Sequence, residues 1–231
     1  MNMNDERSAT LKPRPRIEAF SDLIFGLALS IGALTLISPE YTSFTQLMAA
    51  LGLYAFSFLI LVAVWRSYST ITSILPAETG TLTGLNILLL FLASIEPFLF
   101  NHLYSGEGSM FQGVSVVYAV DLAAMFLILA FFNHSLADEE KGRVPKEHLK
   151  RYRFNRNYDL TIAAMFLISI LPFFGSVNVF QVIIEGIPIG ISLRVFIWIL
   201  ALVSGWVRRL LEKSIDRDEK KPPSKQSGIS T

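Results

Sequence analysis

The chain has 231 residues, of which 52% are hydrophobic and only 17% are charged, and its mean hydropathy is +0.48. Soluble domains carry about 25% charged residues, so this composition predicts an integral membrane protein. The chain contains no cysteine, which excludes disulfides and thiol chemistry. Its three histidines are scattered and form no pair at ligand spacing, so we expect no metal site.

The first segment, residues 1–15, is polar, carries both charge signs and lacks the pattern of a signal peptide. We expect it to be a cytoplasmic tail, followed by a first membrane helix at about Ile17–Ile37. On that helix the spacing of Leu27, Ile31 and Leu34 places three bulky side chains on one face. An adjacent stripe is small enough for another helix to approach closely: Gly26, Ser30 and Ala33.

Further apolar stretches predict five more membrane helices, at about residues 47–65, 85–100, 114–132, 160–174 and 189–207. Pro97 and Pro172 are expected to kink or end two of them. A basic stretch at 147–156 is expected to lie as a helix on the membrane surface, and the apolar link 175–188 is expected at the membrane interface. We therefore predict an all-α fold with a six-helix membrane domain at 16–211 and a disordered cytoplasmic tail at 212–231.

The distribution of positive charge tests this topology. In a six-span arrangement, 19 of the 20 Lys and Arg residues fall on one side of the membrane. Because basic residues concentrate in cytoplasmic loops, both termini are predicted to be cytoplasmic. This topology also accounts for the basic segments, and we expect the lipid bilayer rather than nucleic acid as their partner.

Arg194 is the single basic residue outside the cytoplasmic set, and it lies within the last predicted helix. Asp121 is placed at a similar depth, and Glu96 lies near the outer end of its helix. Because buried charges in a bilayer pair with one another or face water, we expect Arg194 to pair with Asp121 or Glu96. The pair would either lock helix packing or line a water-filled vestibule. No catalytic motif is present, so an enzyme is not expected.

The start of the first helix carries a more specific pattern, Arg16-x-x-x-Phe20-Ser21-Asp22. Together with six spans, Trp65 near the end of the second helix, and the segment 85–90 leading to Pro97, it resembles the transmembrane protein 175 family. Members of that family are potassium-permeable channels of endolysosomes and prokaryotes.

The resemblance implies a homotetramer in a prokaryotic plasma membrane, with the first helix of each subunit lining a central pore. It implies that Leu27, Ile31 and Leu34 form the constriction. It also implies a role in selectivity for the hydroxyl of Ser30, where the family usually has threonine. Another set of residues would hold the first helix through hydrogen bonds to other helices: Arg16, Phe20, Ser21 and Asp22.

The leading hypothesis is a channel for potassium and other monovalent cations, with a hydrophobic constriction, modest selectivity and no cofactor. Taken alone, the spacing of Leu27, Ile31 and Leu34 favours simple packing against protein or lipid, and only the resemblance makes this stripe a candidate pore lining. The alternative hypothesis is a secondary transporter or proton-coupled carrier that uses intramembrane carboxylates. A non-conducting membrane scaffold that acts through the basic segments is a third class.

Overall fold

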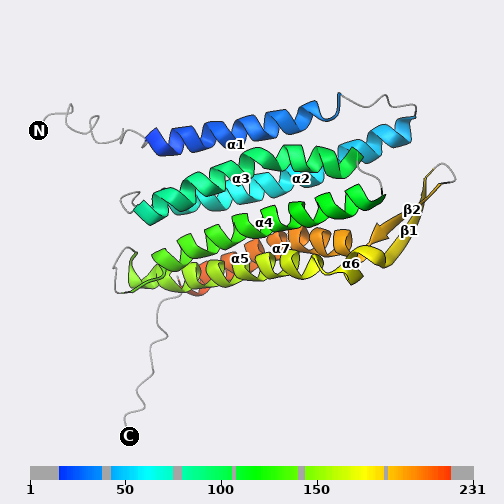
Figure 1. Ribbon diagram of the computed structural model, residues 1–231. Coiled ribbons are helices and arrows are strands. Elements are labelled where there is room, and N and C mark those ends of the chain that lie inside the picture. The colour runs from blue at the N-terminus through cyan, green and yellow to red at the C-terminus, as the bar shows by residue number, and fades with distance from the viewer. Residues whose placement is uncertain are drawn as a thin grey trace, which may run out of the picture.

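The computed structural model describes residues 16–37, 43–74, 80–105, 108–139, 144–184 and 187–219. Within these ranges six long helices run side by side along a common direction (Figure 1). They are α1 (Arg16–Leu34), α2 (Phe44–Thr72), α3 (Gly80–Ser105), α4 (Gly108–Leu136), α5 (Leu149–Ser169) and α7 (Leu193–Glu219). A 3₁₀ turn, Lys146–His148, precedes α5, and the short helix α6 (Pro172–Ser176) follows it. The expectation of a helical membrane protein is confirmed.

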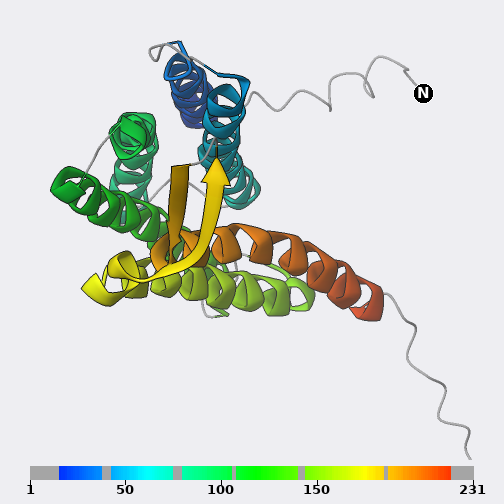
Figure 2. The ribbon, with the colours of Figure 1, turned by 90° about the vertical axis from the view of Figure 1, so that its right-hand side faces the viewer.

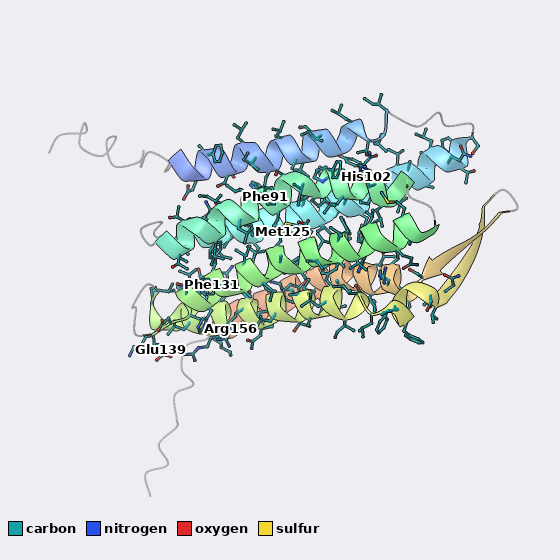
Figure 3. The ribbon with its side chains drawn as sticks, viewed as in Figure 1. Phe91, His102, Met125, Phe131, Glu139 and Arg156 are labelled. Atoms are coloured by element: carbon teal, nitrogen blue, oxygen red, sulfur yellow. The ribbon has the colours of Figure 1, made fainter. Side chains whose placement is uncertain are left out.

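Successive long helices run in opposite directions, so that α1 begins at the end of the bundle where α7 finishes (Figure 1). Figure 3 shows Glu139 and Arg156 at that same end, where α4 gives way to α5. The arrangement brings together the basic segments that the sequence places on one side of the membrane.

Helix α4 lies at the centre of the bundle, between α3 and α5 (Figure 1). Leu122, Met125 and Leu129 are fully buried on it, and Figure 3 labels Met125 among the side chains of the interior. Aromatic rings fill the space between α4 and its neighbours α5 and α7; the Phe126 and Phe166 rings, for example, stack with centroids 6.1 Å apart. Such van der Waals packing holds helices together in a bilayer, where burial of apolar surface from water contributes little.

Three of the described helices are long and apolar enough to cross a membrane: Phe44–Thr72, Gly80–Leu103 and Met110–Leu136. Each of them runs antiparallel to the one before it (Figure 1), so the protein is a multi-pass membrane protein. The apolar part of α7, Leu193–Gly205, is shorter. The prediction of six spans therefore stays a prediction for α1, α5 and α7.

Helix α5 replaces two separate elements expected from the sequence, a surface helix at 147–156 and a span at 160–174. It is continuous from Leu149 to Ser169, because no glycine or proline interrupts it. Tyr152, Asn155 and Asp159 are buried, so its basic first half packs against the bundle through one face.

The segment after α5 also differs from expectation. Helix α5 ends at Ser169, just before Pro172, as expected for a proline that ends a helix, and Pro172 begins α6. The apolar link then forms an antiparallel hairpin of β1 (Asn178–Ile184) and β2 (Ile187–Ser192). It projects from the end opposite to the start of α1, as Figures 1 and 2 show. Its β-branched residues favour strands. The expectation of an apolar link at the membrane interface does not take this preference into account.

Two further boundaries differ from expectation. Pro97 lies inside α3 without ending it, and α3 continues to Ser105. Helix α7 continues to Glu219, so part of the segment expected to be disordered is helical.

Candidate functional site

The face of α1 that points into the bundle is held by hydrogen bonds and close packing. Ser21 is fully buried, and its hydroxyl lies 2.7 Å from the hydroxyl of Tyr68 on α2. One turn later, the buried Phe25 ring lies against the same tyrosine, with centroids 5.7 Å apart. A buried hydroxyl pair of this kind favours one rotation of α1, because turning the helix would break the hydrogen bond.

Asp22 adds a second hydrogen bond from α1 to α2 by accepting from the indole N–H of Trp65 at 2.9 Å. Phe20 differs from what the resemblance implies, because its side chain is exposed on the opposite face and takes no part in this network. Arg16 lies in the first turn of α1, but its side chain is outside the described residues.

Farther along α1, Gly32 permits a close approach to α2. A Cβ atom at this position would lie 3.4 Å from the ring of Tyr54. The Tyr54 hydroxyl donates to the carbonyl of Leu29 at 3.4 Å. Contacts with α2 therefore determine which face of α1 lies inside the bundle along most of its length.

The opposite face of α1 is apolar and uncovered. Leu27, Ile31 and Leu34 are 54%, 43% and 58% exposed. Apart from its own stretch of helix, no described atom lies within 4 Å of a Cβ built on Gly26, and Ser30 is exposed, so the small stripe also faces away from the bundle. The Ser30 hydroxyl donates to the carbonyl of Gly26 at 2.8 Å, which satisfies its proton within the helix.

A second polar site lies inside the bundle, around Glu96 on α3. Its Oε1 accepts from the hydroxyls of Ser57 at 2.7 Å and Tyr118 at 2.9 Å. Its other oxygen, Oε2, is buried and has no hydrogen-bond partner among the described residues. Asp121, one turn beyond Tyr118 on α4, is only 3% exposed and both its carboxylate oxygens lack a partner in the same set.

Arg194 does not pair with either acid, which corrects the expectation from the sequence. Its Nε donates to the carbonyl of Ser169 at 2.8 Å and its Nη2 to that of Ile170 at 3.3 Å. Its Nη1 donates to Gln112 Oε1 at 3.1 Å and to the Ser115 hydroxyl. The last carbonyls of a helix have no partner within it, so Arg194 caps the C-terminus of α5, where positive charge is favourable.

Gly175 in α6 makes room for this cap. A Cβ atom there would lie 2.6 Å from Gln112 Oε1 and 2.9 Å from Arg194 Nη2. Gln112 also donates to the Gly175 carbonyl at 3.3 Å. The sequence signal that could have revealed the cap is Pro172, which marks the end of α5 and so the free carbonyls.

Comparison with known proteins supports the resemblance carried by the first helix. The sequence profile of the family described as endosomal/lysosomal potassium channel TMEM175 matches residues 16–97, which cover α1, α2 and most of α3. Sequence comparison with curated proteins gives no match.

The fold is similar to the crystal structure of a lysosomal potassium-selective channel TMEM175 homologue from Chamaesiphon minutus. The TM-score is 0.57 and the identity 21%, over 84% of this chain and 96% of that one. The predicted resemblance to the family is therefore confirmed. Both matches are to ion channels and neither is to an enzyme.

Proposed function

We propose that this protein is a potassium-permeable cation channel of a prokaryotic plasma membrane. In this proposal four copies assemble with α1 of each around a central pore, and all six long helices cross the membrane. The match of the TMEM175 profile to residues 16–97 supports potassium as the permeant ion. The bacterial source of the structural homologue supports the location.

The observation that carries the proposal is the difference between the two faces of α1. One face is fixed to α2 by the Ser21–Tyr68 and Asp22–Trp65 hydrogen bonds. The other carries the exposed row Leu27, Ile31 and Leu34. A helix whose rotation is fixed can present the same side chains to a symmetry axis in every subunit.

The chemistry of that row suits a hydrophobic constriction. Rings of leucine and isoleucine stop conduction by dewetting when they are narrow and pass ions when they widen. They supply no oxygens to replace an ion's hydration shell, so discrimination between cations should be modest. Ser30 is the exception, because donation to the Gly26 carbonyl leaves its oxygen lone pairs free to face a cation.

Ion flux in liposomes tests the assignment. The purified protein should carry potassium down its gradient, and Leu27→Ala or Ile31→Ala should raise conductance and reduce the preference for potassium over sodium. A matched control is Leu127→Ala on α4, because Leu127 is 43% exposed, as is Ile31, but lies on another helix. Unchanged flux and selectivity in both α1 variants would contradict the pore assignment.

The alternative, a proton-coupled carrier, has one observation in its favour, the buried oxygens of Glu96 and Asp121 without a partner. Intramembrane carboxylates are common in proton relays. A carrier predicts saturable flux with counterflow, lost in Glu96→Gln or Asp121→Asn. A channel predicts unsaturated flux that responds to changes at Leu27 and Ile31.

A further inference from the structure

A cavity of about 140 Å³ opens between α2, α5 and α7. By the same measure, a single water molecule needs only about 10–15 Å³. On α5 the lining runs from Arg151 to Phe166, which corresponds to about 22 Å of helix. The cavity is therefore elongated along the bundle, as an extended ligand would require.

The two ends of the cavity differ in chemistry. Toward the middle of the bundle the lining is apolar, with Ile60, Phe126, Ile162, Phe166 and Ala201. Toward the end where α5 begins, three arginines line it: Arg66, Arg151 and Arg208. A ligand that fills both ends must be an amphiphile with a negatively charged group.

Two of these arginines are available for that group. In the described part of the chain, neither Arg66 nor Arg151 makes an ion pair or a side-chain hydrogen bond. Arg208 is already engaged, because it lies 3.5 Å from Asp159 Oδ1 and 4.7 Å over the Tyr158 ring. Two uncompensated guanidinium groups beside one cavity favour an anion, and phosphate suits their geometry.

Asn155 supplies an independent indication of a ligand. It lines the cavity between the arginines and the apolar part, and it is only 6% exposed. Its Oδ1 is buried without a hydrogen-bond partner among the described residues. Because a buried acceptor without a donor is unfavourable, this atom requires a donor from whatever occupies the cavity.

We propose that this cavity binds an anionic phospholipid whose headgroup carries a hydroxyl, such as phosphatidylglycerol. Arg66 and Arg151 hold the phosphate, a headgroup hydroxyl donates to Asn155 Oδ1, and one acyl chain lies along the apolar wall. This end of the bundle is the predicted cytoplasmic side, where anionic headgroups attract basic residues. The site does not depend on the channel function proposed above.

Each part of the ligand answers a separate feature of the cavity. A soluble phosphate compound would leave the apolar wall unfilled. A zwitterionic choline lipid would bring a quaternary ammonium that cannot donate to Asn155 and is repelled by Arg66 and Arg151. A hydroxylated anionic lipid satisfies all three features together.

Native mass spectrometry of the full chain released from detergent provides the test. The probes are dioleoylphosphatidylglycerol, dioleoylphosphatidylcholine and glycerol 3-phosphate. We expect the glycerol lipid to be retained roughly tenfold more tightly than the choline lipid. The hydrogen bond to Asn155 and the absence of a repelled ammonium group need together to contribute only about 1.4 kcal/mol to give that ratio. Glycerol 3-phosphate should not be retained.

Two variants on one helix separate the site from general surface charge. Arg151→Gln should lower retention of the glycerol lipid severalfold. Arg153→Gln is the matched control: it removes the same charge, but Arg153 is exposed, pairs with Glu139 and does not line the cavity. Should Arg151→Gln fail to fold, Arg66→Gln on α2 makes the same comparison, and Ala63→Leu should lower retention by filling the apolar part.

Several results would overturn the proposal. Equal retention of the two lipids would remove the role of the headgroup, and tight binding of glycerol 3-phosphate would assign the site to a soluble ligand. Equal losses in the cavity variant and in Arg153→Gln would reduce it to nonspecific attraction. If a cavity variant changed the oligomeric mass of the protein but kept the bound lipid, the cavity would be an interface between copies of this chain.

Discussion

Arg194 and Asp121 are both buried ionisable residues of the helix bundle, but they differ in their hydrogen-bond partners. Arg194 donates to two backbone carbonyls, an amide and a hydroxyl. Asp121 has no hydrogen-bond partner in the described chain for either carboxylate oxygen. Arg194 and Asp121 were expected to form an ion pair. Instead they lie in separate surroundings, where only the arginine has hydrogen-bond partners among the described residues.

Their positions relative to helix ends explain the difference. Arg194 faces the C-terminus of α5, where carbonyls are free because the helix ends. Asp121 lies in the middle of α4, where every backbone N–H is used within the helix. A buried cation can therefore use backbone carbonyls at a helix end, whereas a buried anion in mid-helix depends on side-chain donors.

The largest expected effect is that of Arg194→Ala. Each hydrogen bond from a charged donor contributes about 1.5–3 kcal/mol, and several are lost together, so we expect the free energy of unfolding to fall by at least about 3 kcal/mol. Denaturation in mixed detergent micelles measures it. Arg153→Ala is the control, because an exposed ion pair contributes only about 0–1 kcal/mol. Equal effects in the two variants would refute the capping role.

Gly175→Ala tests the same cap without removing a charge. The new methyl would meet Gln112 Oε1 and Arg194 Nη2, and overpacking of this kind costs about 1–3 kcal/mol. We expect a loss toward the lower end, because both atoms are the ends of long side chains. Gly26→Ala is a suitable control, since nothing lies within 4 Å of its added methyl. A stability unchanged from the original protein would mean that the cap can shift freely.

The unpartnered acid should respond with the opposite sign. Asp121→Ala removes no hydrogen bond among the described residues. It removes a buried polar group without a partner, and burial of such a group costs about 1–3 kcal/mol. We expect stability to rise by about 1 kcal/mol after the lost packing is subtracted. Glu96→Ala is the contrast and should be destabilising, because the hydroxyls of Ser57 and Tyr118 lose their acceptor. A loss of stability in Asp121→Ala would show that this carboxylate has a partner, such as a bound cation.

The sequence was sufficient to predict the long helices other than α5, and the two faces of α1. Periodicity places Leu27, Ile31 and Leu34 together, and the structure leaves them exposed on one face. Such predictions succeed because a helix fixes which side chains share a face, whatever surrounds it.

Contacts between distant segments could not be predicted in the same way. The partners of Arg194 are partly backbone carbonyls, which no residue pattern reveals. Asp159 precedes the membrane helix expected at 160–174, yet it is buried within α5 and accepts from Asn133 at 2.8 Å. The cavity beside Asn155 depends on the packing of α2, α5 and α7, and helix packing is not encoded in any one helix.

The smallest expected effect comes from the Ser21–Tyr68 pair, which gives a neutral reference for the two charged residues. Its hydroxyls are buried and 2.7 Å apart. A double-mutant cycle with Ser21→Ala and Tyr68→Phe should give a coupling energy of about 0.5–1.5 kcal/mol, the usual range for an uncharged hydrogen bond. That value should lie below the loss in Arg194→Ala, because the arginine bonds are charge-assisted.

The same variants also test function. If the Ser21–Tyr68 pair fixes the rotation of α1, each single variant should alter ion flux. A coupling near zero together with unchanged flux would mean that the Phe25 packing and the Asp22–Trp65 bond orient α1 by themselves.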